Sequence, residues 1–412
     1  MRNPDAGNFS GFSLTPLWTI LRSEGDDLAR EAERFADPEV FRALVDLAMR
    51  ERLAPALHER VEAIARPTWS RLQRVRLATA YEANCRRNRA LRATIVALGA
   101  AADRRGFCLA PLKGANWFFS GTDPIASWRT MLDADVLVDP ERIEDFRAIL
   151  RELGLEPIAD GGARRTRSFR GHFHLPPHVD RRTGALVEAH RHVGFQPFRL
   201  PNALMFAGEA AAEPGIVTPS PWCATFHLIL HWQIQHNGLA RMTCPARDVY
   251  ELFRRIRDAE VDWERLAAHA RKVNAMHACI ASLALAHELF DVDVPRGFAI
   301  SRAAQSRVRL CLELQDDESR RWVFAQFGRC TAYWRADRAK YSLAPLALPK
   351  PLAAACLWFF RLLVLPAIAW RATRALVGMA VLRLYRPAFV RWFSDDSTDR
   401  APSAVFRRRP II

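Results

Sequence analysis

Two aspartates, Asp133 and Asp135, lie two positions apart at the start of the apolar run 136–138. In a strand, side chains two positions apart project from the same face, so both carboxylates are expected on one side of a sheet. Neighbouring carboxylates repel each other unless a cation lies between them, and Mg²⁺ takes such oxygen ligands together with phosphates and water. Asp133 and Asp135 are therefore candidate Mg²⁺ ligands, and the alternative is a pair of solvated turn residues.

Two further features accompany this pair. Gly114 follows a short apolar run twenty residues before Ala134. Glycine allows backbone N–H groups to approach a phosphate closely, and the start of a following helix attracts anions. A third acid, Glu188, lies in a strand-like segment at 185–190. A strand, a glycine turn with a helix, an Asp-x-Asp strand and a later strand with an acid form the layout of polymerase-β-type nucleotidyltransferases, in which two metals bridge three carboxylates and a triphosphate.

The sequence resembles the uncharacterised nucleotidyltransferase family of bacterial biosynthetic gene clusters, within the polymerase-β-like superfamily. Three segments carry the resemblance: Leu-Lys-Gly-Ala at 112–115, Arg-x-x-x-Asp-x-Asp-x-Leu-Val at 129–138 and Glu-x-His at 188–190. The similarity extends over about residues 100–300. The sequence departs from the superfamily at Ala115, where serine is usual, so a hydroxyl that could contact phosphate is missing.

The resemblance implies roles for the matching residues. Asp133, Asp135 and Glu188 would be the catalytic carboxylates and Mg²⁺ ligands, and Glu188 could also act as general base on an acceptor hydroxyl. The residues that would bind nucleotide phosphates are Lys113, Gly114 and Arg129. The implied reaction transfers a nucleotidyl group from an NTP to an unknown small-molecule, sugar or protein acceptor. The alternative is a non-catalytic nucleotide-binding or scaffold protein at the membrane surface, which Ala115 favours.

Histidines gather in the same region and further along the chain. His172, His174 and His178 form a His-x-His-x-x-x-His pattern that could bind zinc, contact a substrate or be structural. His174 and His190 are the candidates for substrate contact beside the carboxylates. His227 and His231 lie four apart within a helix expected over 225–236, without a His-Glu-x-x-His motif, so this helix is expected to pack on the nucleotidyltransferase domain.

The helices and strands expected around these residues, together with the family resemblance, predict an α+β fold. In this fold a small polymerase-β-like nucleotidyltransferase domain with a mixed sheet is flanked by N- and C-terminal helical regions. Buried strands are expected at 107–112 and 136–138, and a helix at 143–153. A break near Pro55 divides the helical run 38–65. The expected domains are a helical region at 1–100, the nucleotidyltransferase-like α/β domain at 101–200, a helical domain at 215–345, an apolar and basic helical tail at 350–393 and a disordered end at 394–412.

Composition excludes several classes of protein. Half of the 412 residues are apolar and a quarter are charged, which excludes general disorder. No Walker A, Gly-x-Ser-x-Gly or Gly-x-Gly-x-x-Gly motif is present, so P-loop, serine hydrolase and Rossmann functions have no support. Eight scattered cysteines and a polar start without a signal peptide predict a cytoplasmic protein with free thiols.

The basic charge is concentrated at the C-terminal end. The chain has a net charge of +15, and from Lys350 onwards eleven Lys and Arg stand against three Asp. This charge lies in an apolar tail and is not interleaved with aromatic residues on a strand face, so nucleic-acid binding is not expected. Arg361 at the centre of 352–370 opposes insertion into a bilayer. Peripheral membrane contact through 352–393 and packing against the protein's own helices both stay open, and the oligomeric state is not predicted.

Overall fold

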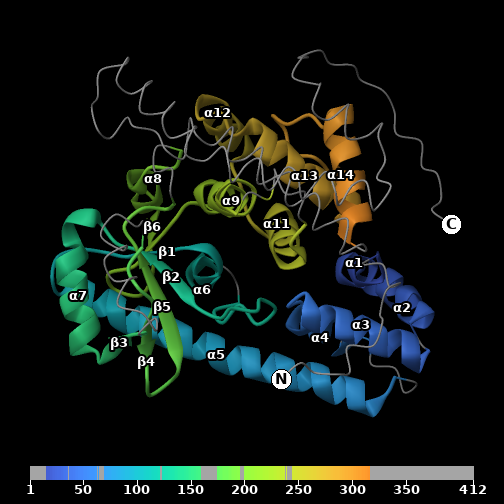
Figure 1. Ribbon diagram of the computed structural model, residues 1–412, viewed down its shortest axis with the longest axis horizontal. Coiled ribbons are helices and arrows are strands. Elements are labelled where there is room, and N and C mark those ends of the chain that lie inside the picture. Colours follow the sequence, from blue (N-terminus) through green and yellow to red (C-terminus); the bar gives the residue numbers. More distant parts are fainter. Residues whose placement is uncertain are drawn as a thin grey trace, which may run out of the picture.

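The computed structural model describes residues 15–315 except 36, 63, 65–68, 121–122, 159–173, 195–198, 237 and 239–243. The main sheet of the protein is mixed, and helices precede and follow its strands along the chain. This arrangement confirms the expected α+β fold, a nucleotidyltransferase domain with helical flanks (Figure 1). The predicted tail at 350–393, the predicted disordered end at 394–412 and His172 lie outside the described residues. Across the described part of the chain, every helix is too short or too polar to cross a bilayer.

The main sheet has the strand order β1-β2-β5-β4-β3. Its strands are β1 (Ala110–Pro111), β2 (Ala134–Leu137), β3 (Leu155–Pro157), β4 (His178–Asp180) and β5 (Ala185–His190). Only β2 and β5 pair in parallel; the other neighbours are antiparallel. A separate two-stranded sheet pairs β6 (Glu209–Ala210) with β7 (Val217–Thr218).

The strand expected at 107–112 is shorter than predicted. Only β1 forms, because Pro111 has no N–H to donate and the chain turns into a 3-10 helix at Lys113. The strands expected at 136–138 and 185–190 are present as β2 and β5. Gly184, in the turn that leads into β5, has φ +73°, which glycine adopts without strain.

The N-terminal helices are α1 (Thr15–Arg22), α2 (Gly25–Arg34), α3 (Pro38–Arg50), α4 (Ala54–Glu62) and α5 (Arg71–Asp103). The break expected near Pro55 is present at 51–53, and Pro55 itself lies in the first turn of α4, where it loses no helical hydrogen bond. The 33-residue helix α5 runs from below α4 to the sheet and contacts both (Figure 1). It thereby connects the N-terminal helices to the strands that carry the acids.

The remaining helices follow the first strand. They are η1 (Lys113–Asn116), α6 (Trp117–Ser120), η2 (Pro140–Arg142), α7 (Ile143–Glu152), α8 (Asn202–Phe206), α9 (Pro221–Leu230), η4 (His231–Gln235), α11 (Ala246–Asp258), α12 (Trp263–Lys272), α13 (Met276–Phe290) and α14 (Arg302–Gln315). The helix expected over 225–236 begins earlier, at Pro221, and becomes a π-helix, η4, at His231.

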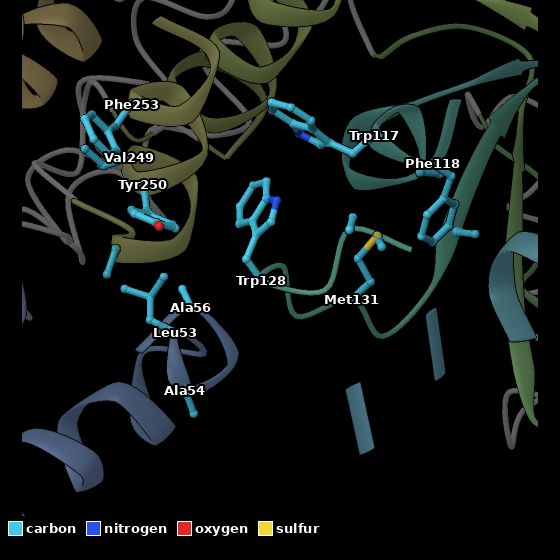
Figure 2. Close-up of a cluster of buried hydrophobic side chains, with 14 of the residues drawn as sticks. Leu53, Ala54, Ala56, Trp117, Phe118, Trp128, Met131, Val249, Tyr250 and Phe253 are labelled. Carbon is cyan, nitrogen blue, oxygen red and sulfur yellow. The ribbon is translucent and has the colours of Figure 1, made fainter. Parts of the chain in front are cut away.

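One hydrophobic cluster joins the N-terminal helices, the sheet and helices α11, α13 and α14. Figure 2 shows part of it, where Trp128 lies between Trp117, Tyr250 of α11 and Leu53 at the start of α4. The Trp128 ring makes edge contacts with both other aromatic rings, at centroid distances of 5.4 and 5.6 Å. The segment before Asp133 is therefore held between helices from both flanks. The division into domains stays a prediction.

Candidate active site

A cavity of about 360 Å³ lies beside β2 and β5. The eight residues to which the sequence assigned a catalytic, phosphate-binding or substrate-contact role all line it: Lys113, Gly114, Arg129, Asp133, Asp135, His174, Glu188 and His190. The cavity is also lined by Arg52, Gln235, His236 and Arg247, which the sequence did not single out, and by His231, which was expected only on a packing helix. The cavity is thus a candidate active site with acids, imidazoles and cations on one surface.

The parallel pairing of β2 with β5 brings the acids together. Asp135 is the register partner of Glu188, and His190 follows Glu188 on the same face of β5. The ligand atoms of Asp135, Glu188 and His190 all lie within 4.8 Å of one another, a group able to hold a metal ion. Asp133, one residue before β2, lines the same cavity but is not a member of this close group.

Asp135 is the most strongly bound acid of the site. Its Oδ1 accepts a hydrogen bond from Lys113 Nζ at 2.8 Å and another from His190 Nε2 at 2.7 Å. Burial by itself would raise the pKa of Asp135, but Lys113 and His190 outweigh it and hold the pKa well below its usual value. Burial likewise opposes the charge on Lys113, yet Asp135 keeps the pKa of Lys113 raised. The two residues therefore form an ionised pair in which Asp135 is buried and Lys113 is half-buried.

The other two acids are less well neutralised. Burial and the neighbouring Asp135 and Asp133 raise the pKa of Glu188 to about 7. Burial and Asp135 also raise the pKa of Asp133. Carboxylates that repel each other in one cavity, with oxygen atoms free to coordinate, are a donor set that fits a divalent cation such as Mg²⁺. The residues present thus fit the expected metal, and its identity is addressed below as a proposal.

Arg129 forms a buried ion pair with Glu251, a residue that the sequence did not single out. Arg129 Nε donates to Glu251 Oε2 at 2.6 Å, while Trp117 Nε1 and Arg255 Nη2 donate to Glu251 Oε1 at 2.9 and 3.2 Å. Burial would raise the pKa of Glu251, but Arg129 and Arg255 outweigh burial and lower it to about 2. The sequence did contain a signal for this ion pair: Glu251 lies among the apolar residues of α11, four residues before Arg255.

Two asparagines of α5 position the segment that leads to Arg129. Asn84 Nδ2 donates to the carbonyls of Ser127 and Arg129, at 2.8 and 3.0 Å. Asn88 Nδ2 lies within hydrogen-bonding distance of the carbonyls of residues 125, 126 and 129. Both asparagines are buried, so this long helix fixes the backbone of the loop that enters β2.

Gly114 lies directly on Arg129. A Cβ atom at Gly114 would be 2.3 Å from Arg129 Nη1 and 2.6 Å from Met131 Sδ. Replacing Gly114 with alanine is therefore expected to displace Arg129 and to lower the free energy of unfolding by about 1–3 kcal/mol. Urea denaturation followed by tryptophan fluorescence measures this loss. Gly114 is not among the glycines with a positive φ, so the loss would come from the clash and not from backbone strain. Equal stability of Gly114→Ala and wild type would contradict the close packing.

The π-helix η4 brings a pair of histidines to the cavity. Its wide turn lets His236 N donate to the carbonyl of His231 at 3.0 Å, and the two ring Nε2 atoms lie 3.0 Å apart. In a regular α-helix, residues five apart would point in clearly different directions, so the spacing gave no signal for this pair. His227, in contrast, is buried, and burial together with Lys113 lowers its pKa to about 3. The segment 221–235 both packs on the domain, as expected, and lines the cavity.

A five-stranded mixed sheet with adjacent acids on two parallel strands and helices on both flanks is the arrangement of a nucleotidyltransferase domain. Over residues 37–291 the sequence matches the family described as uncharacterised nucleotidyltransferase, and the chain belongs to this family. The matched region contains every residue that lines the cavity. No curated protein and no solved structure matched the chain. The family supports nucleotidyl transfer as the general activity.

Proposed function

We propose that the protein is a Mg²⁺-dependent nucleotidyltransferase that transfers a nucleotidyl group from an NTP to a hydroxyl of a small-molecule, sugar or protein acceptor. One observation carries this proposal: Asp135 and Glu188 face each other across parallel strands, in a cavity that also contains Asp133 and Lys113, in a chain of the nucleotidyltransferase family. An acceptor made by a bacterial biosynthetic gene cluster would agree with the resemblance that the sequence shows.

The protein residues divide into two groups. Asp133, Asp135 and Glu188 would hold the metal, and when bound Mg²⁺ would supply positive charge to the triphosphate. Lys113 and Arg129, with the backbone at Gly114, would bind phosphate oxygens and orient the α-phosphate. His174 and His190, whose rings lie 5.4 Å apart, would contact the substrate beside the carboxylates.

The chemical step is an in-line displacement. The acceptor oxygen forms a bond to the α-phosphorus while the bond between that phosphorus and the bridging oxygen of the β-phosphate breaks. Glu188 would accept the hydroxyl proton, and pyrophosphate leaves with the bridging oxygen. Glu188 is suited to this role because it is half-buried and lines the same cavity as the predicted phosphate-binding residues.

Calorimetry tests the proposal. Wild type and the double variant Asp133→Asn/Asp135→Asn are titrated with ATP, GTP, CTP and UTP, each with Mg²⁺ and with EDTA. We expect wild type to bind at least one NTP with Mg²⁺, and we expect this binding to be lost with EDTA and in the variant, because the variant lacks two of the three carboxylates. Failure of wild type to bind any NTP, alone or with a metabolite extract as the source of acceptor, would contradict the proposal.

The alternative of a non-catalytic nucleotide-binding or scaffold protein is not favoured, since all three carboxylates are present in the cavity. Binding of an NTP without release of pyrophosphate in the presence of the extract would favour it instead. A cytoplasmic location with peripheral membrane contact through 352–393 is also part of the proposal. Unchanged membrane partitioning after deletion of residues 350–412 would exclude the tail as an anchor.

A further inference from the structure

Arg52 lies between α3 and α4, in the N-terminal helical region, and lines the cavity of the candidate active site. Its backbone has φ +60°, in the left-handed region that is unfavourable for residues with a Cβ atom. Arg52 N donates to Met49 O at 3.3 Å and Leu53 N donates to Ala48 O at 2.8 Å. This pattern of hydrogen bonds ends many helices, and the residue in the left-handed position is usually glycine.

The side chain of Arg52 is the feature that glycine would lack. Among the residues that the structure describes, four lysines and arginines line the cavity, and three of them are paired with acids: Lys113 with Asp135, Arg129 with Glu251, and Arg247 with Asp248. The guanidinium of Arg52 is exposed and makes no hydrogen bond or ion pair with any residue that the structure describes. It is thus a cation at the rim of the cavity that is available to an anionic ligand.

The backbone around Arg52 is firmly attached to the site. Thr130 Oγ1 donates to the carbonyl of Arg52 at 2.9 Å, and Arg247 Nη1 lies 3.4 Å from the carbonyl of Thr130. The next residue, Leu53, is 1% exposed and belongs to the cluster around Trp128 (Figure 2). Arg52 and Arg247 are thus both attached to Thr130, in the loop that enters β2.

We propose that Arg52 binds the polyphosphate of the nucleotide at the rim of the cavity, so that the N-terminal helices complete the nucleotide site. This inference rests on the proposed function. The three acids and the expected metal would engage the triphosphate beside β2 and β5, and the guanidinium of Arg52, a planar fork of N–H donors, matches the remaining phosphate oxygens. Arg52 occupies a left-handed position at a helix end where glycine would be less strained, which agrees with a functional role for its side chain.

Variants of Arg52 separate binding from folding, because the two properties are expected to change in opposite directions. Arg52→Gly removes the charge and relieves the left-handed strain, so it is expected to weaken nucleotide affinity about tenfold while the thermal midpoint stays equal or rises. Arg52→Ala is expected to weaken affinity equally without the gain in stability. Arg52→Lys keeps the charge but not the fork, so its loss is expected to be smaller. Arg50→Ala, an exposed arginine outside the cavity, is the matched control and is expected to bind like wild type.

Affinity is measured by calorimetry with Mg²⁺ and each of the four NTPs, and with Mg²⁺ and tripolyphosphate as a probe that needs no base recognition. A tenfold loss for Arg52→Gly and Arg52→Ala with tripolyphosphate and with the bound NTP supports the inference. Wild-type affinity in both variants, while Asp133→Asn/Asp135→Asn abolishes binding, overturns the role of Arg52 and leaves the proposed function intact. Wild-type protein that binds neither any NTP nor tripolyphosphate overturns both.

Discussion

Replacing Asp135 with asparagine is expected to lower the rate of Mg²⁺-dependent nucleotidyl transfer by at least about 100-fold. Asparagine keeps the shape of the side chain but removes the negative charge that lies at the centre of the site, between Lys113, His190 and Glu188. The rate is measured as release of pyrophosphate from the NTP that binds wild type, with a metabolite extract as the source of acceptor.

The stability of this variant must be measured alongside its activity. Without the carboxylate, the half-buried ammonium of Lys113 loses its ionised partner, which is expected to lower the free energy of unfolding by about 1.5–3 kcal/mol. The assay is therefore run at a temperature at which circular dichroism shows the variant to be folded. Asp145→Asn, an exposed acid on α7, is the control and is expected to retain wild-type activity. Retained turnover in folded Asp135→Asn would contradict the assignment.

Replacing Glu251 with glutamine is expected to give the largest loss of stability, about 3–5 kcal/mol at pH 7. Glu251 is fully buried and accepts hydrogen bonds from Arg129, Arg255 and Trp117. Glutamine leaves two buried guanidinium groups without a counter-charge. Urea denaturation of both proteins at pH 7 measures the difference, and Glu264→Gln, an exposed acid in the first turn of α12, is the matched control.

The contribution of Glu251 to the free energy of unfolding is also expected to decrease at low pH. The pKa of Glu251 falls from 4.5 to about 2 on folding, so the carboxylate contributes its full stability above pH about 4.5 and loses it as the pH falls toward 2. A shift of this size corresponds to about 3 kcal/mol. The difference in unfolding free energy between wild type and Glu251→Gln should therefore be largest at neutral pH and shrink below pH about 4.5. A difference that is constant down to pH 3 would show that Glu251 is not held ionised by Arg129 and Arg255.

The acids that carry the expected chemistry could be found from local sequence patterns. Asp133 and Asp135 precede an apolar run, and Glu188 and His190 lie two apart in another, so the period of a strand was enough to place each pair on one face. Strands β3 and β4 could not be found in the same way. Each of these strands has only three residues. Three of their six residues, Glu156, Pro157 and Asp180, are of types that are uncommon in strands, so both strands depend on pairing with their neighbours.

The sequence by itself determined the side-chain chemistry of the site, the α+β class and the local placement of the acids, because helix and strand periodicities are properties of neighbouring residues. Only the tertiary structure decided which distant segments meet. The register of Asp135 opposite Glu188 joins strands separated by β3 and β4, and the contact of Arg129 with Glu251 joins a loop to α11. Arg52 reaches the cavity because α3 and α4 pack against the loop that enters β2. Such contacts depend on burial and register over the whole chain, which no local pattern encodes.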